Sequence, residues 1–460
     1  MAEIRCISPV DGEVFAARQA MPRAEAQERI RRSRIAGKSW AARPLAERCA
    51  LVMKAIHQLA THQDEAAEEV TMMMGRPKAQ FFEFNGCIER ATYMAGIAET
   101  ALAPIVAEDS DSFERRIERE PVGIVFIVAP WNYPYLTTIN SLVPALIAGN
   151  SVIMKHAAQT LLAGERIVNA FEEAGFPEDV LQNVFFDHAT TSDLIGEGHF
   201  GFVNFTGSVG GGQAMERAAA GTFTGVGTEL GGKDPAYVME DANLEAAVSA
   251  LMDGAFFNAG QCCCGIERIY VHERLYDRFV EMALAEVKKL KLGNPLEEGT
   301  TIGPMANVRF ASEVRDQIRE AIADGARALV PEGYFAVDDG GAYLGPQILV
   351  DVTHDMRVMR DESFGPVVGI MKVSSDEEAI GLMNDSEFGL TASLWTEDAD
   401  RAARIGRQIE TGTVFMNRCD YLDPAVCWTG CKNTGRGTTL SVLGYQSLTR
   451  PKSFHLKKAL

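Results

Sequence analysis

The sequence lacks long apolar segments. Its longest apolar runs, such as residues 122–129, have the length of a strand and are too short to cross a bilayer. The first residues, Met-Ala-Glu-Ile-Arg-Cys-Ile-Ser, include no basic segment followed by an apolar stretch, the pattern that marks a secretory signal peptide. We therefore expect neither membrane association nor secretion.

An excess of basic residues is also missing. The chain has 44 lysines and arginines against 63 aspartates and glutamates, a formal net charge of −19. Nucleic acids and anionic membrane surfaces are polyanions, so this balance argues against either as a partner. The nine cysteines include three consecutive ones, which is unlike a secreted disulfide framework. Free thiols fit a reducing compartment, and we expect a cytoplasmic protein.

Short apolar runs that alternate with amphipathic stretches dominate the rest of the sequence. With 460 residues, the chain is expected to form two or three domains. After a helix-rich region at residues 23–104, the alternation occupies residues 122–229 and restarts after residue 232. The expected strands are residues 123–129, 151–155, 183–186, 201–205, 235–239 and 267–272, and the expected helices are residues 161–174, 213–219, 244–257 and 275–290. Strands that alternate with helices pair in parallel, so we predict the α/β class with doubly wound sheets.

The three consecutive cysteines, at residues 262–264 after a Gly-Gln pair, are a candidate source of a nucleophilic thiol. Taken alone, free cysteines are more often small buried hydrophobic residues. A metal site is the other alternative, but three adjacent thiols are poor chelators and no histidine-rich segment lies nearby, so no metal is expected. Adjacent side chains point in different directions, so we expect only one of the three to face a common site.

Two further segments supply a carboxylate and an amide. Glu229 ends a glycine-rich apolar segment, where partial desolvation would raise its pKa toward the range of a general base. Asn132 lies in Pro-Trp-Asn-Tyr-Pro at residues 130–134, where two prolines fix the turn after an expected strand. A rigid amide donor there can stabilise a developing alkoxide. The alternatives are a surface glutamate and an asparagine that hydrogen-bonds its own turn.

A glycine-rich stretch, Phe-Thr-Gly-Ser-Val-Gly-Gly-Gly at residues 205–212, follows one expected strand and precedes an expected helix. In that context, backbone N–H groups and a helix N-terminus can face a pyrophosphate. A flexible loop is the alternative interpretation.

These motifs, in this order, resemble the NAD(P)-dependent aldehyde dehydrogenase superfamily, in its hydrolytic branch that does not acylate CoA. The resemblance covers essentially the whole chain. It implies a dinucleotide-binding domain at residues 1–105 and 122–231 and a catalytic domain at residues 232–438. Residues 106–121, a charged segment expected to form a hairpin, and residues 439–460 would build a β arm for a homodimer or homotetramer.

The resemblance also implies roles for single residues. The catalytic thiol is the second residue after Gly-Gln, which is Cys263, and Asn132 with the Cys263 backbone N–H would hold the oxyanion. Glu229, absent from the CoA-acylating branch, would activate the water that hydrolyses the thioester. The residues expected at the cofactor are Trp131, Lys155, Gly207, Ser208, Gly212, Leu230, Gly231, Glu362 and Phe364. Those expected at the substrate are Asn140, Phe257, Cys262 and Cys264.

Some positions depart from the family pattern near the cofactor and the base. Ala158 stands where many NAD-preferring members carry a glutamate, so we expect NAD as cofactor with NADP also plausible. Ser141 and Thr439 stand where a lysine and a glutamate form a proton relay in many hydrolytic members. Both relay groups are therefore missing, and proton release from Glu229 would use water.

Other departures concern the substrate. Asn140 and Phe257 stand where succinic semialdehyde dehydrogenases carry arginines, so we expect an uncharged tunnel and an uncharged aliphatic or aromatic aldehyde. Arg418, beside the expected entrance, could supply a charge from another direction. Further thiols are expected near that entrance, where small residues lining a loop are the favoured interpretation; they are Cys419, Cys427 and Cys431.

The expected function is NAD(P)-dependent oxidation of an aldehyde to a carboxylic acid through a covalent thioester. Three alternatives stay open: a semialdehyde dehydrogenase of the succinic type, a CoA-acylating enzyme, and a catalytically inactive scaffold of the same fold.

Overall fold

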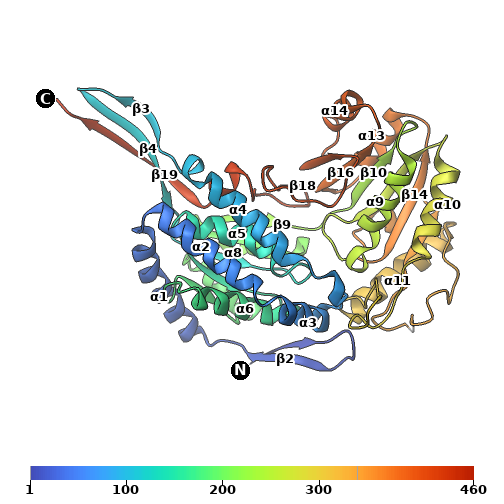
Figure 1. Cartoon of the computed structure of the whole chain (residues 1–460), viewed down its shortest axis with the longest axis horizontal. Coiled ribbons are helices and arrows are strands. Elements are labelled where there is room, and N and C mark those ends of the chain that lie inside the picture. The colour runs from blue at the N-terminus through green and yellow to red at the C-terminus, as the bar shows by residue number, and fades with distance from the viewer. Residues whose placement is uncertain (1, 339, 460) are drawn as a thin grey trace.

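The computed structural model describes residues 2–338 and 340–459, and two large sheets organise the described chain (Figure 1). Most elements drawn from blue to green surround the first sheet, and those drawn from yellow-green to orange surround the second. The chain passes from one to the other between β9 (Gly225–Glu229) and β10 (Asp234–Val238). Among the described residues, no helix has the length and apolar character needed to cross a membrane.

The first sheet reverses its strand order in the middle. It consists of β5 (Ile124–Val128), β6 (Ser151–Lys155), β7 (Leu181–Asn183), β8 (Phe202–Thr206) and β9. All neighbours pair in parallel, in the order β7-β6-β5-β8-β9. The chain moves outward from β5 to β7 and then returns to the other side of β5 at β8. Ligands of open α/β sheets bind at the C-terminal strand ends beside such a reversal.

Strand β5 explains why helices cover both faces of this sheet. All five of its residues are buried, and alternate ones belong to different apolar clusters: Val125 and Ile127 to one, Ile124 and Phe126 to the other. A strand that is apolar on both sides needs cover on both. The helices are α1 (Arg23–Ala41), α2 (Leu45–Ala60), α3 (Gln63–Met74), α4 (Glu83–Ala101), α5 (Leu136–Ile147), α6 (Leu161–Glu173), α7 (His188–Gly196) and α8 (Val209–Ala219).

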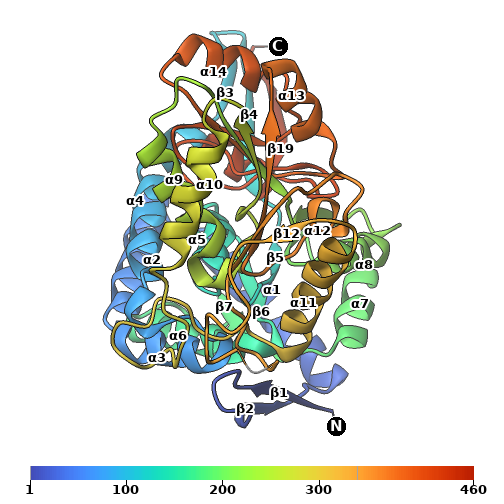
Figure 2. The same ribbon diagram turned by 90° about the vertical axis from the view of Figure 1, so that its right-hand side faces the viewer.

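The second sheet repeats this architecture. Its strands are β10, β11 (Ile266–His272), β12 (Arg327–Ala328), β13 (Gln347–Val350), β14 (Val367–Val373), β16 (Thr391–Trp395) and β17 (Thr413–Met416). The order is β12-β13-β14-β11-β10-β16-β17, and only β12 runs antiparallel to its neighbour. Its helices are α9 (Leu244–Phe256), α10 (Tyr276–Val287), α11 (Val308–Ala323), α12 (Arg357–Arg360), α13 (Asp376–Asn384) and α14 (Ala399–Gly406). Helices α9 and α10 pack side by side (Figure 2). The predicted α/β class with doubly wound sheets is confirmed.

One expected strand is wrong in position. The third strand, expected at residues 183–186, is β7 at Leu181–Asn183. Val184 and Phe186 are apolar because they are buried in the cluster under α7, not because they pair in the sheet. A run of apolar residues indicates that a segment is buried, but it does not show which of its residues pair in the sheet.

Three antiparallel strands extend away from both sheets (Figure 1). They are β3 (Ile105–Asp109), β4 (Phe113–Pro121) and β19 (Thr449–Lys457), in the order β19-β4-β3. β4 pairs with β19 along its whole length, and the hairpin expected from the charged segment is present as β3 and β4. The remaining short elements are β1 (Glu3–Ile7), β2 (Val14–Gln19), β15 (Phe388–Gly389), β18 (Cys431–Lys432), η1 (Lys78–Gln80), η2 (Ala158–Thr160), η3 (Phe257–Gly260) and η4 (Val442–Tyr445).

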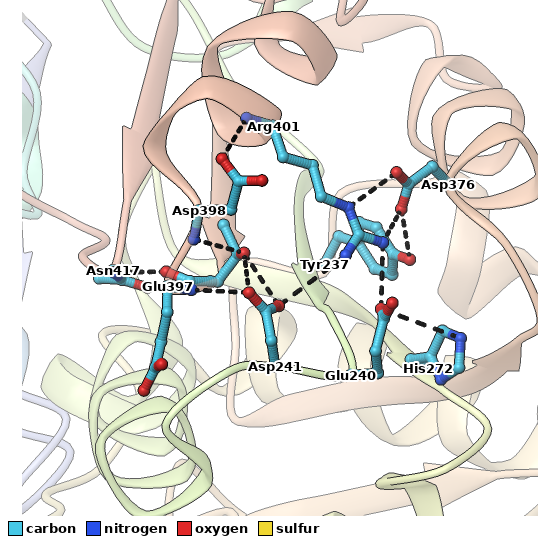
Figure 3. Close-up of polar contacts among 10 residues, drawn as sticks. Tyr237, Glu240, Asp241, His272, Asp376, Glu397, Asp398, Arg401 and Asn417 are labelled. Atoms are coloured by element: carbon cyan, nitrogen blue, oxygen red, sulfur yellow. Dashed lines mark hydrogen bonds and ion pairs between the residues drawn. The ribbon is translucent and has the colours of Figure 1, made fainter.

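A polar network around Arg401 joins the end of β10 to α13 and α14 (Figure 3). The Arg401 guanidinium donates to both carboxylate oxygens of Asp376, at 2.6 and 2.9 Å, and to Glu240 at 3.0 Å. The Tyr237 hydroxyl donates to Asp376 at 3.0 Å. One side chain thus connects two helices to a strand of the sheet.

Replacing Arg401 with methionine should therefore lower the melting temperature. Hydrogen bonds to charged groups contribute about 1.5–3 kcal/mol each, and the removal leaves three carboxylates, those of Asp376, Glu240 and Asp241, without their shared cation. Differential scanning calorimetry of Arg401→Met beside Arg407→Met measures the effect. Arg407 caps the C-terminus of the same helix, is exposed, and forms no ion pair within residues 2–338 and 340–459. Equal melting temperatures for the two variants would contradict the role given to this network.

Candidate active site

A cavity of about 470 Å³ opens beside the ends of β8 and β9 of the first sheet. Its lining comes from α4, from the segment after β5, from the ends of β8 and β9, from α9 and the turn after it, and from residues between 420 and 428. β5 and β8 are the strands between which the order of the first sheet reverses, so the cavity lies where such sheets bind ligands. Of the residues expected in the site, those that line the cavity are Asn140, Glu229, Leu230, Phe257, Cys262, Cys263 and Cys264.

The turn before the three cysteines has a strained backbone. Asn258, Ala259 and Gly260 have positive φ angles of 54°, 55° and 70°, a region that residues other than glycine rarely occupy. A Cβ atom on Gly260 would lie 2.3 Å from a backbone carbonyl oxygen of the facing loop, so only glycine fits there. The buried Gln261 side chain fixes the turn: it donates to the Asn258 carbonyl at 3.1 Å and accepts from the Ala306 N–H at 2.8 Å. This turn aims the thiols into the cavity.

All three thiols face the same space. Their sulfur atoms lie within 4.8 Å of one another, and those of Cys262 and Cys264 are 3.5 Å apart. Asp420 accepts hydrogen bonds from these two thiols, at 3.3 Å and 2.9 Å. The expectation that adjacent cysteines point apart is wrong, because the alternation of side chains holds in strands and helices. Residues 262–264 lie instead in the turn between η3 and β11.

The flanking thiols make Cys263 more acidic. Interactions with Cys262 first and Cys264 second lower the pKa of the Cys263 thiol to about 6. The interaction with Cys263 is the first cause that raises the pKa of Cys262, to about 12, and Cys262 and Cys263 also raise the pKa of Cys264. Of the three thiols, Cys263 is the one that ionises near neutral pH, and the thiolate is the nucleophilic form.

Asn132 is held against the turn that carries the thiols. Its side-chain Nδ2 donates to the Gln261 carbonyl oxygen at 3.2 Å. Arg76 joins the two segments: its Nε donates to Oδ1 of Asn258 at 3.1 Å, and its Nη2 donates to the Asn132 carbonyl. Its Nη1 pairs with Glu83 at 2.8 Å, and both side chains are buried. This buried ion pair, which no motif in the sequence had indicated, fixes the amide relative to the thiols.

Glu229 has its carboxylate in the cavity wall at the end of β9. Oε1 accepts a hydrogen bond from the Thr439 hydroxyl at 2.6 Å, and Oε2 accepts one from the Thr206 hydroxyl at 3.2 Å. Burial raises the pKa of Glu229, and these two hydrogen bonds oppose the rise. Thr439 thus contacts Glu229 directly, whereas the Ser141 hydroxyl is buried with no hydrogen-bond partner among the described residues.

Two charged groups expected at the cofactor have unused hydrogen-bonding capacity. Oε1 of Glu362 accepts from the Gly232 N–H at 2.9 Å, but no described residue donates to Oε2. Burial raises the pKa of Glu362 to about 8. A Cβ atom on Gly231 would lie 2.3 Å from both carboxylate oxygens, so glycine makes room for this side chain. Lys155 ends β6, burial lowers its pKa, and its ammonium group contacts no acceptor in the described part of the chain.

The glycine-rich stretch after β8 is shorter than expected, because the helix starts early. Helix α8 begins at Val209 instead of residue 213, so only Gly207 and Ser208 precede it. The Ser208 hydroxyl caps the helix by accepting from the Gly211 N–H at 3.3 Å, which offsets the low helix propensity of glycine. Gly212 has a packing role, since a Cβ atom there would lie 2.7 Å from the Leu230 side chain. The helix N-terminus itself stays favourable for an anion.

Trp131 and Phe364 lie together at the edge of this region. Trp131 stacks on Phe310 and meets Phe364 edge to face, with ring centroids 5.4 Å apart in both pairs. The loop of Phe364 is fixed by Glu267, whose carboxylate accepts from the Phe364 N–H at 2.8 Å and pairs with the buried Lys233. No motif in the sequence had indicated this role of Glu267.

Aromatic rings form one wall of the cavity. The ring of Phe257 lies 5.7 Å from that of Phe82, which lies 6.2 Å from that of Tyr133, and all three residues line the cavity. Phe257 is therefore part of a larger aromatic wall that Phe82 and Tyr133 complete.

The expectation of an uncharged tunnel is wrong. Arg90, on α4, lines the cavity and is only 6% exposed. Its Nη1 donates to Oδ1 of Asn140 at 2.8 Å. An arginine from α4 therefore lies next to Asn140, the position where the sequence had indicated that an arginine is missing. Arg418 does not line the cavity; its guanidinium lies 3.5 Å from the centre of the Tyr421 ring.

The remaining thiols stay outside the cavity lining. The Cys419 thiol donates to the Ala250 carbonyl at 3.4 Å, and that of Cys431 donates to the Glu410 carbonyl at 3.0 Å. Burial raises the pKa of both. Neither these two cysteines nor Cys427 is among the described residues that line the cavity.

Comparison with known proteins shows the family to which the chain belongs. Residues 1–454 match the aldehyde dehydrogenase family. An aldehyde dehydrogenase from Paenarthrobacter nicotinovorans is 34% identical, over 98% of this chain and 99% of the relative. The vanillin dehydrogenase of Corynebacterium glutamicum is 34% identical, over 94% of this chain and 89% of the relative. The solved structure of succinic semialdehyde dehydrogenase from Streptococcus pyogenes with NADP+ has a TM-score of 0.93 and 29% identity, and the match covers 99% of this chain and 100% of that one. The chain therefore belongs to the aldehyde dehydrogenase family of NAD(P)-dependent oxidoreductases.

Proposed function

We propose that the protein oxidises an aldehyde to a free carboxylic acid through a covalent intermediate on Cys263. The thiolate of Cys263 adds to the aldehyde carbonyl. The side-chain N–H of Asn132 and the backbone N–H of Cys263 stabilise the alkoxide that forms. Oxidation of this thiohemiacetal leaves a thioester, and NAD(P)+ supplies the hydride acceptor when bound. Glu229 then takes a proton from the water that hydrolyses the thioester.

The meeting of a thiol and a carboxylate in one cavity carries this proposal. Cys263 and Glu229 both line the cavity, and Asn132 is hydrogen-bonded to the turn before the thiol. The pKa of Cys263 is lowered and that of Glu229 is raised, which suits a nucleophile and a base respectively. The presence of Glu229 favours hydrolysis over transfer to CoA.

The proposed cofactor residues fit NAD(P). The ammonium of Lys155 can donate to ribose hydroxyl groups, and the free Oε2 of Glu362 can accept from others. The N-terminus of α8 would face the pyrophosphate. Ala158 is exposed and brings no carboxylate against a 2′-phosphate, so we propose that NAD and NADP both serve. The full proposed set is Trp131, Lys155, Gly207, Ser208, Gly212, Leu230, Gly231, Glu362 and Phe364.

We also infer which part of the chain serves each role. Residues 1–105 and 122–231 would bind the cofactor, and residues 232–438 would hold the nucleophile. The arm of β3, β4 and β19, within residues 106–121 and 439–460, would join copies into a homodimer or homotetramer in the cytoplasm. Ile105 and Val106 support this role, because they are 55% and 62% exposed on the arm, and exposed apolar residues mark interaction surfaces.

Turnover of simple aldehydes tests the function. The purified protein, mixed with butanal or benzaldehyde and either NAD+ or NADP+, should form reduced cofactor and an equal amount of free acid without CoA. Product formation that depends on added CoA would support the acylating alternative. No reduced cofactor with any aldehyde would support the inactive scaffold.

The acidity of Cys263 gives a second expected outcome. Inactivation by iodoacetamide should rise with pH around a midpoint near 6 instead of near the ordinary value of 9.0, because the thiolate reacts. Cys262→Ala removes the largest lowering effect, so the midpoint should move upward, whereas Cys419→Ala, outside the cavity, should leave it in place. Rates of inactivation at a series of pH values measure both. A wild-type midpoint near 9 would contradict the role of the flanking thiols.

A further inference from the structure

Arg90 is a buried cation that no carboxylate of the described residues contacts, although the charges of Glu229 and Glu89 are near enough to act on its pKa. It is 6% exposed, and among the described residues it forms no ion pair. Its only hydrogen bonds with described residues start from Nη1, to Asn140 Oδ1 at 2.8 Å and to the Leu136 carbonyl at 3.1 Å. Nε and Nη2 have no acceptor in this set.

Three other buried cations of the described chain are paired or use all three guanidinium nitrogens. Arg76 pairs with Glu83, and Lys233 pairs with Glu267. Arg268 donates to backbone carbonyls through Nε, Nη1 and Nη2. Burying a charge is costly unless it is paired or hydrogen-bonded, and guanidinium keeps its charge in proteins. The difference at Arg90 is that its unused donors belong to a residue lining the substrate cavity.

A second unused donor adjoins the first. Because Arg90 donates to Oδ1 of Asn140, the amide nitrogen of this residue is turned elsewhere, and it is buried without a hydrogen-bond partner among the described residues. Asn140 lines the same cavity. A guanidinium edge and an amide N–H in one wall are donors suited to the two oxygens of a carboxylate.

Acidic side chains also line the cavity, and they are otherwise engaged. The Glu89 carboxylate accepts from the Tyr421 hydroxyl at 2.7 Å and is exposed, so it lies at the mouth. Asp420 accepts hydrogen bonds from the thiols of Cys262 and Cys264. Burial raises the pKa of Asp253, Asp420 and Glu229, and in Glu229 the two threonine hydrogen bonds and the charge of Arg90 oppose this rise. Arg90 is the one lysine or arginine among the described residues of the lining.

We propose that Arg90, together with the Asn140 amide, binds an anionic group at the far end of the substrate, so that the enzyme prefers aldehydes bearing a carboxylate. This inference rests on the proposed function and names the substrate class of the same site. The carboxylate would accept from Nε or Nη2 of Arg90, whose planar fork matches two oxygens. Arg90 then acts as a specificity-determining residue.

Matched pairs of aldehydes test the preference. Succinic semialdehyde is compared with methyl 4-oxobutanoate, and 4-formylbenzoate with methyl 4-formylbenzoate, by kcat/KM in the wild type. We expect at least one acid to exceed its neutral ester by ~10-fold or more, the range of a hydrogen bond to a charged group. In Arg90→Gln this ratio should fall below ~3, and in Arg90→Lys it should be intermediate, since lysine keeps the charge without the fork. Arg418→Gln removes an exposed charge outside the lining and should keep the wild-type ratio.

Different outcomes would overturn the role of Arg90 and the proposed function. If the wild type oxidises the esters and benzaldehyde but shows no preference for either acid, the Arg90 inference is overturned and the proposed function stands. If no aldehyde is oxidised, the proposed function itself fails. A preference for betaine aldehyde over its neutral isostere 3,3-dimethylbutanal would show that the acidic residues dominate, and would also overturn the inference. The wild-type ratios decide these points even if Arg90→Gln does not fold.

Discussion

Replacing Glu229 with glutamine should stop turnover after one burst of reduced cofactor. Cys263 can still attack the aldehyde and the thioester can still form, but glutamine cannot take a proton from the hydrolytic water. General bases contribute about 10²–10⁴-fold, so the steady-state rate should fall by that factor. Glutamine keeps the size of the side chain, its carbonyl oxygen can still accept from one of the Thr439 and Thr206 hydroxyls, and its amide N–H can donate to the other, so the fold should be retained. Stopped-flow absorbance would show a burst equal to the number of active sites.

Thr439→Val is the matched control for this experiment. It keeps the carboxylate and removes the hydrogen bond that lowers the pKa of Glu229. A base works in its ionised form, so the acidic limb of the kcat profile should move to higher pH in this variant, while multiple turnovers continue. Unchanged steady-state turnover in Glu229→Gln would mean that another group activates the water.

Replacing Arg76 with methionine should cause the largest loss of stability. Arg76 and Glu83 form a buried ion pair, with side chains 1% and 0% exposed, and removing one partner of such a pair costs about 3–5 kcal/mol. The carboxylate of Glu83 also accepts from the Tyr135 and Leu136 N–H groups, at the start of α5. Activity should fall as well, because Arg76 joins the turn of Asn132 to the turn of the thiols. Chemical denaturation and kcat measure the two effects.

Two controls sharpen this prediction. Arg278→Met breaks the surface pair with Glu245, whose side chains are 64% and 69% exposed, and such pairs contribute little. The double variant Arg76→Met with Glu83→Gln should recover part of the stability, because it leaves no unpaired buried charge. Equal losses for Arg76→Met and Arg278→Met would contradict a buried, tightly coupled pair.

The fold was predictable from the sequence where burial and pairing coincide. Strand β6, expected at residues 151–155, has those bounds because the whole apolar run pairs in the sheet. Strand β7 was misplaced because its apolar run continues beyond the paired residues. The start of α8 was missed because a cap, Ser208, outweighs the low helix propensity of the glycines that follow.

The site was predictable to the extent that its motifs are local. Glu229 and Cys263 were found from short segments and line one cavity. The left-handed turn before the thiols could not be predicted, because the residue types of Asn258 and Ala259 do not indicate positive φ angles. Arg76 was missed because its partner across the site, Asn258, lies 182 residues away.

The burial of Arg90 on α4 could have been predicted from the helical spacing of the apolar residues around it. On α4 the buried residues include Cys87, Ala91 and Met94, and Arg90 adjoins this apolar stripe. An arginine on the buried face of an amphipathic helix needs a partner or a function.

The most direct test of the account is the covalent intermediate itself. Glu229→Gln protein is mixed with NAD+ and either benzaldehyde or 4-formylbenzoate, quenched in acid after one burst, digested, and analysed by fragment mass spectrometry across residues 262–264. The account predicts one acyl group per active site, located on Cys263. An acyl group on Cys262 or Cys264, or a full burst of reduced cofactor with no acylated cysteine, would contradict it.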